Sequence, residues 1–201
     1  LGPNHRVYFD SASSVPVSKI AENAFHRTIK ESFANASSIH KEGEKAKDIL
    51  FEARKRIAKC IHAKGNNVHF TGSTTEANNI FIKGIALANK DAHIIYSKSD
   101  HSAIVEVVEA CKQFGSSFTS IVPNKIGLLT PEEIVKGINE KTKLICFSYV
   151  SSELGTIQPV RKIAQAVQEH CKKNFPNMAV PAIFIDATQA VKYESMDVGN
   201  L

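Results

Sequence analysis

The segment 71–76, with the sequence TGSTTE, combines a glycine with several hydroxyl groups directly before a helical pattern. Backbone N–H groups at the start of a helix, together with the helix dipole, favour the binding of a phosphate dianion. The same segment fits a second interpretation, because Ser73 and Glu76 have the spacing of a capping box. A nucleotide P-loop is excluded, since the lysine that follows its second glycine is missing. The segment therefore predicts either a phosphate cradle or an ordinary helix cap.

A histidine, His101, follows a short apolar run in the sequence SKSDH at 97–101. A histidine at the mouth of an α/β sheet can stack on a planar ligand or relay a proton near neutral pH. It can also be a partly solvated side chain beside an Asp or Ser cap. The polar segment 151–155, SSELG, follows another apolar run and decides nothing by itself, because it also fits an ordinary turn.

A carboxylate, Asp186, comes directly after the apolar run AIFI. A partly buried carboxylate needs a cation or several hydrogen-bond donors to stay ionised. A ring nitrogen that must remain protonated would be such a cation. Alternatively, Asp186 is a capping residue that accepts hydrogen bonds from nearby backbone N–H groups.

Taken together, these segments supply a phosphate cradle, a stacking imidazole and a buried anion. Pyridoxal phosphate requires this set, because its phosphate must be anchored, its ring covered and its pyridinium paired with an acid. The combination therefore predicts a pyridoxal 5'-phosphate site.

Short apolar runs alternate with helical patterns along the chain, after an extended start at 7–9. We expect strands at 68–70, 93–97, 118–122, 144–150 and 182–186, and helices at 17–33, 42–61, 74–88, 103–114, after Pro131 and at 160–173. Such alternation indicates β-α-β units, which favour a mostly parallel sheet covered on both faces. The expected fold class is α/β, with three α/β/α layers. Ligands of such sheets bind beyond the carboxyl ends of the strands, where the candidate residues stand.

The composition of the 201-residue chain, 43% hydrophobic and 22% charged, supports a buried core and excludes overall disorder. No run approaches the ~18 apolar residues of a membrane span, and the N-terminal LGPNHRVYFD lacks the apolar core of a secretory signal. We therefore expect a cytoplasmic protein without a membrane partner. The segment 1–16 is expected to be extended, and 17–201 to form one cofactor-binding domain.

The net charge of +5 permits an anionic ligand. Most of the excess lies between Lys41 and Lys64, where acidic residues are interleaved in a helical pattern typical of a solvated face. No stacking aromatic residues accompany these lysines and arginines, so we expect no nucleic-acid partner. The chain has four cysteines, which are far apart in sequence and predict neither structural disulfides nor a metal site: Cys60, Cys111, Cys146 and Cys171.

Six segments resemble the class V aminotransferase family of pyridoxal-phosphate enzymes, and within it the cysteine desulfurases most closely. They are VYFDSASSVPV near the start, FANASSIHKEG at 33–43, FTGSTTEANNIFIKG at 70–84, SKSDHSAI at 97–104, ELGTIQP at 153–159 and FIDATQAV at 184–191. The resemblance runs from Val7 to the C-terminus. It implies the large domain of a fold-type-I enzyme.

The resemblance also implies a role for each matching residue. The phosphate contacts of the family fall on Thr74 and Thr75, and the ring-stacking histidine, a candidate for proton transfer, falls on His101. The pyridinium partner falls on Asp186, and the hydrogen bond to the ring oxygen falls on Gln189. An amide contact expected at Ser152 is replaced by a shorter hydroxyl, because Ser151 and Ser152 stand where desulfurases usually carry two asparagines.

The Schiff-base lysine of the family lies further beyond the Asp-Ala-Thr-Gln segment than the fifteen residues that follow Asp186 here. Its persulfide-forming cysteine and its arginine for the substrate carboxylate lie further still. We therefore expect this chain to be about the N-terminal half of an enzyme and, alone, to be inactive.

The function implied for the parent protein is sulfur transfer: L-cysteine is converted to L-alanine, and an enzyme-bound persulfide supplies iron–sulfur cluster assembly or thiolation. A homodimer and a sulfur-acceptor protein are the implied partners. The alternatives are a selenocysteine lyase, an aminotransferase or an epimerase of the same family, or a non-catalytic half that binds a second polypeptide.

Overall fold

The computed structural model describes residues 7–11 and 13–199. Contacts between residues divide the chain into two compact units, 1–69 and 70–201. Part of the predicted extended segment, residues 1–6 and 12, lies outside the described residues. The predicted domain 17–201 stays a prediction.

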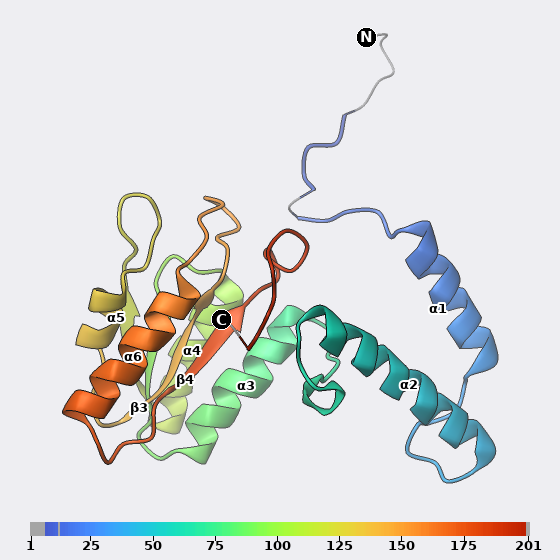
Figure 1. The fold of residues 1–201 in the computed structure, drawn as a ribbon, viewed down its shortest axis with the longest axis horizontal. Coiled ribbons are helices and arrows are strands. Elements are labelled where there is room, and N and C mark those ends of the chain that lie inside the picture. Colours follow the sequence, from blue (N-terminus) through green and yellow to red (C-terminus); the bar gives the residue numbers. More distant parts are fainter. Residues whose placement is uncertain (1–6, 12, 200–201) are drawn as a thin grey trace. The chain divides into compact units, whose positions relative to one another are not determined.

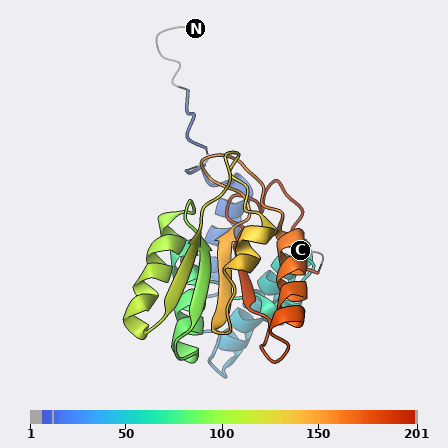
Figure 2. The ribbon, with the colours of Figure 1, turned by 90° about the vertical axis from the view of Figure 1, so that its left-hand side faces the viewer.

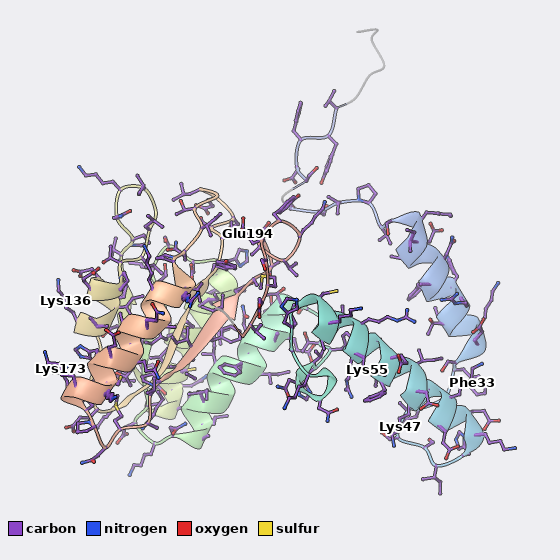
Figure 3. The ribbon with its side chains drawn as sticks, in the orientation of Figure 1. Phe33, Lys47, Lys55, Lys136, Lys173 and Glu194 are labelled. Atoms are coloured by element: carbon purple, nitrogen blue, oxygen red, sulfur yellow. The ribbon has the colours of Figure 1, made fainter. Side chains whose placement is uncertain are left out.

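Unit 1 contains two helices, α1 (Lys19–Glu31) and α2 (Lys41–Cys60), and a short 3-10 helix, η1 (Gly65–Asn67). Both α-helices begin and end within two residues of the predicted ranges. Helix α2 carries the mixed charges of the sequence on its surface, where Lys47 and Lys55 point away from the helix axis (Figure 3). Lys55 pairs with Glu52 at 2.8 Å, and both side chains are about half exposed. This face is solvated, as the charge pattern predicts.

Unit 2 is built on a four-stranded parallel sheet with the order β2-β1-β3-β4 (Figure 2). The strands are β1 (His93–Ser97), β2 (Ser117–Ile121), β3 (Thr142–Ser148) and β4 (Ala182–Asp186). β1 and β4 coincide with the predicted runs, whereas β2 and β3 begin one and two residues earlier than expected.

The prediction of a strand at 68–70 is wrong. The N–H group of Val68 instead donates to the carbonyl of Gly65 in a 3-10 turn. A β-strand exists only where its backbone groups pair with a neighbouring strand. No strand of the described residues pairs with this segment, so its apolar side chains alone do not make it a strand.

Helices cover both faces of the sheet. One face packs against α3 (Thr74–Ala88) and α4 (Ser102–Ala110), which η2 (Cys111–Phe114) extends, and the other packs against α5 (Pro131–Lys136) and α6 (Val160–Asn174) (Figure 1). Side chains alternate between the two apolar clusters along each strand: Ile94 and Tyr96 face α3 and α4, and Ile95 faces α5 and α6. The predicted three-layer α/β fold is confirmed.

The connections that follow β1 and β3 leave the sheet in opposite directions. β1 leads through α4 to β2 on one side, and β3 leads through α6 to β4 on the other. Because these two connections diverge, a crevice opens beyond the carboxyl ends of β1 and β3, where ligands of parallel sheets bind. Among the described residues, no helix has the length and apolarity that crossing a membrane requires.

Candidate functional site

A cavity of about 210 Å³ lies at this crevice, within unit 2. Its lining includes all six side chains predicted from the sequence to bind the cofactor: Thr74, Thr75, His101, Ser152, Asp186 and Gln189. Four further residues complete the lining: Ala103, Ser148, Val150 and Thr188. The residues come from the start of α3, the start of α4 and the loops after β3 and β4. The fold therefore brings together residues that are more than a hundred positions apart in the sequence.

The start of α3 is capped by Ser73 as the spacing predicts, but Glu76 completes the cap on Gly72, one residue before the N-cap, rather than on Ser73. Ser73 Oγ accepts the N–H of Glu76 at 3.1 Å, and the carboxylate of Glu76 accepts the N–H of Gly72. The first amides of a helix have no acceptor within the helix, and those of Thr74 and Thr75 stand in this position. The cap and the cradle are thus compatible, because the cap uses the amides of Gly72 and Glu76.

His101 is the N-cap residue of α4. Its Nδ1 accepts the N–H of Ala103 at 3.1 Å. An imidazole nitrogen that accepts a hydrogen bond carries no proton, so the geometry assigns the proton of neutral His101 to Nε2. His101 is thus itself the cap of α4, rather than a residue beside an Asp or Ser cap, and its side chain also lines the cavity.

Asp186 ends β4 and begins a local turn. Its Oδ1 accepts both the N–H of Thr188 at 3.0 Å and the hydroxyl of Thr188 at 2.6 Å. The hydroxyl of Thr188 also lies 3.2 Å from that of Thr74. Thr188 therefore links the end of β4 to the start of α3, a role that the sequence analysis did not assign. The signal available was an aspartate followed two residues later by a donor, which is the pattern of an Asx turn.

Ser152 stands in the loop that follows β3, where a bridge between Val150 and Ile157 closes a short antiparallel turn. Buried Gln158 fixes this loop, since its Oε1 accepts the N–H of Leu129 at 2.9 Å and its Nε2 donates to the carbonyl of Gly127 at 2.8 Å. Gly127 has φ +78°, in a tight turn before α5 that favours glycine. The exposed Ser152 is thus held by contacts made elsewhere in its loop.

A second carboxyl group, Asp100, lies close behind the cavity and was not among the predicted site residues. Its Oδ2 accepts the N–H of Ser148 at 2.9 Å. Burial raises the pKa of Asp100 to about 6, and the nearby charge of Asp186 acts in the same direction. Burial also raises the pKa of Cys146, a core thiol of β3. The sequence places Asp100 next to His101 but does not show that it reaches a neighbouring strand.

The residues of the cavity fit a phosphorylated cationic ring. Helix amides with threonine hydroxyls suit a phosphate, a carboxylate suits a protonated ring nitrogen, and an imidazole suits a ring face. Metal ligands are a poorer fit, because the described residues contain no group of three or more His, Cys, Asp or Glu side chains placed to hold an ion.

Comparisons with known proteins agree with this chemistry. Residues 7–201 match the model of the family Aminotransferase class-V. The cysteine desulfurase IscS of Dictyoglomus turgidum is 36% identical over 166 residues, which are 82% of this chain and 42% of that protein. The cysteine desulfurase IscS of Methanosarcina thermophila is 33% identical over 202 residues, 98% of this chain and 47% of that protein.

Solved structures resemble the chain over nearly its whole length. A structure described as SspA in complex with cysteine has a TM-score of 0.87 and 31% sequence identity. The match covers 96% of this chain and 54% of that chain. A NifS-like protein, 24% identical, has the same fold with a TM-score of 0.87. That match covers 96% of this chain and 52% of the NifS-like chain. The chain spans about half the length of the curated relatives that it matches. On the match over residues 7–201, with a parallel α/β sheet and a cavity that suits the family's cofactor, the chain belongs to the class-V aminotransferase family.

Proposed function

We propose that the cavity at the carboxyl ends of β1, β3 and β4 binds pyridoxal 5'-phosphate and that the chain is part of a cysteine desulfurase. The single observation that carries the proposal is the convergence of Thr74, His101 and Asp186 on one cavity from three separate elements. The cysteine desulfurases among its relatives, and the related structure whose description includes cysteine, support L-cysteine as the substrate. The products would be L-alanine and sulfur passed to an acceptor protein.

Each residue has a defined task in this proposal. Thr74 and Thr75 bind the phosphate through their amides and hydroxyls, and Gln189 and Ser152 offer polar contacts to the ring substituents. Asp186 keeps a ring nitrogen protonated. Pyridoxal phosphate, when bound, supplies an electron sink for bond breaking at the α-carbon of an amino acid. His101 covers the ring and donates or recovers a proton at Nε2, since Nδ1 is engaged by Ala103.

The binding part of the proposal is tested with pyridoxamine 5'-phosphate, whose amine cannot react with surface lysines. We expect saturable one-site binding that is weakened about tenfold by Thr74→Val, which removes one hydroxyl contact to the phosphate, and about tenfold at pH 7.5 by Asp186→Asn, which removes one charge-assisted contact. The Asn variant still accepts the bond from Thr188, so its fold is preserved. Asp91→Asn, at an exposed loop position, is the matched control. Equal affinity of Asp186→Asn and wild type would contradict the pairing with a ring nitrogen.

The reaction part is tested by incubating L-cysteine and cofactor with this chain and with the longest polypeptide that its gene encodes. We expect alanine and protein-bound persulfide from the longer polypeptide. In parallel reactions that offer L-selenocysteine with a thiol reductant, alanine and selenide formed from selenocysteine but no alanine from cysteine would indicate a selenocysteine lyase, and an amino-group acceptor requirement would indicate an aminotransferase. If the longer polypeptide forms neither alanine nor persulfide, the desulfurase assignment is wrong. A homodimer is proposed for that longer polypeptide.

A further inference from the structure

Asp100 ties together the two strands that part at the cavity. Its side chain accepts the N–H of Ser148, the last residue of β3, at 2.9 Å. Its own N–H donates to the carbonyl of Ser97, the last residue of β1, at 3.3 Å. The residue that directly follows is His101. The turn that presents the imidazole is therefore attached to both central strands of the sheet through one residue, to β3 by its side chain and to β1 by its backbone.

Asn78 holds the same helix start from the other side. This residue of α3 is 1% exposed, and its Nδ2 donates to the carbonyl of Ala103 at 3.2 Å. Ala103 in turn donates its N–H to Nδ1 of His101. His101 is thus held by β3 through Asp100 and by α3 through Asn78, and α3 also carries Thr74 and Thr75.

A carboxyl group at this place opposes folding at neutral pH, because burial and the charge of Asp186 both disfavour its ionised form. Groups kept in such surroundings beside a cavity are typical of functional sites. The free energy lost by burying Asp100 is consistent with a role at the cavity rather than in general packing.

We propose that Asp100 is a positioning residue, which fixes His101 at the cavity through the hydrogen bond that it accepts from Ser148. Asn78 provides the opposing contact. The consequence for ligand binding rests on the proposed function, because a fixed imidazole contributes only when a ring occupies the cavity.

The orientation of His101 is measured without any ligand, by ¹⁵N-correlated NMR of the histidine rings. The His101 signals are identified by their absence in His101→Gln, and wild type is expected to show the tautomer with the proton on Nε2. In Asp100→Ala these signals should move toward the average of both tautomers. Asp100→Asn should retain the wild-type signals, because its amide oxygen accepts the same N–H. Ser99→Ala, in the same turn, is the matched control.

Unchanged His101 signals in Asp100→Ala would overturn the proposal, and so would an Asn variant that behaves like the Ala variant. If Asp100→Ala does not fold, Asn78→Leu serves as the second variant, with Asn79→Leu as its control, since Asn79 bonds only within its own helix in the described contacts. Asn78→Leu should disturb the His101 signals and Asn79→Leu should not. The reverse result would also overturn the proposal.

Binding gives a second, separable readout. Asp100→Ala should weaken pyridoxamine 5'-phosphate binding about tenfold, the order expected when an aromatic side chain no longer stacks on a ring, and leave inorganic phosphate binding unchanged. The reason is that the phosphate contacts lie on α3, whereas the ring is covered by His101. Equal loss for both probes would overturn a role through His101. If wild type binds neither probe, the proposed function fails, while the NMR measurement still decides whether Asp100 positions His101.

Discussion

Two polar side chains of the cavity, those of His101 and Asp186, have a structural partner as well as a second atom for a ligand. His101 uses Nδ1 to cap α4, and Asp186 uses Oδ1 in a local turn. Nε2 of His101 and Oδ2 of Asp186 are the second atoms of these groups. For Asp186, the cap interpretation and the binding interpretation, which look like alternatives in the sequence, therefore apply to different oxygens of one carboxylate.

Replacing Asp100 by Asn is expected to change how the free energy of unfolding depends on pH. The raised pKa of about 6 means that the unfolded chain ionises this group first, near pH 3.8, while the folded chain still holds the proton. Stability is therefore lost as the pH rises from about 4 to about 6, by at most about 3 kcal/mol. Asp100→Asn should be more stable than wild type above pH 6 and equal to it below pH 4.

This prediction is checked by urea unfolding of both proteins at pH 4, 6 and 8. Asp91→Asn, whose carboxylate is exposed, should show no comparable gain. A difference between wild type and Asp100→Asn that stays constant across this pH range would mean that the carboxyl group is not the cause.

At the scale of elements, loops on the carboxyl side of the sheet support one another. The turn 124–129 precedes α5, and the loop 150–158 precedes α6. Gln158 joins them through two backbone contacts, and Thr156 adds a third by donating to the carbonyl of Ile126 at 2.8 Å. Ser152 depends on this pair of loops for its position.

Gln158→Ala should therefore destabilise unit 2 by about 2–4 kcal/mol, because it leaves one buried N–H and one buried carbonyl unpaired. Gln165→Ala, on the exposed side of α6, should change the free energy of unfolding by less than about 0.5 kcal/mol. Thermal or urea unfolding measures both. Similar values for the two variants would show that the contacts of Gln158 contribute little.

At the scale of the whole molecule, the two edges of the sheet differ in character. β2 is an edge strand rich in Ser and Thr, whereas β4 is apolar until Asp186. Among the described residues no strand pairs with the outer edge of β4, and a groove of about 440 Å³ runs between this edge and the start of α3. Lys136 of α5 and Lys173 of α6, on the face of the sheet opposite to α3, point outward (Figure 3). An apolar unpaired edge favours strand addition by another copy.

The chain studied alone should therefore self-associate with rising concentration. Val180→Lys, next to β4, should reduce this association more than Val122→Lys, next to β2, because a charge opposes strand pairing only at the edge that pairs. Sedimentation velocity across a range of concentrations measures the effect. A compact monomer at every concentration, with cooperative unfolding, would contradict the prediction.

The local features of the site were predictable because the hydrogen bonds that form them join residues only a few positions apart in the sequence. The cap of α3 joins residues three apart, and Asp186 bonds to Thr188 two residues on. The apolar runs 93–97 and 182–186 locate β1 and β4, and six ordered segments predict the family. The cofactor roles of Thr74, Thr75, His101, Ser152, Asp186 and Gln189 stay predictions, although all six line one cavity.

Only the tertiary structure decided which distant groups meet. Asp100 bonds to Ser148 across 48 positions, Gln158 to Leu129 across 29, and Thr74 lies beside Thr188 across 114. The run at 68–70 has the composition of a strand but lacks a partner in the described residues. A helix satisfies its backbone hydrogen bonds within its own segment, so its sequence suffices to predict it. A strand, or a buried polar side chain, depends on whichever neighbour the packing of the whole chain brings beside it.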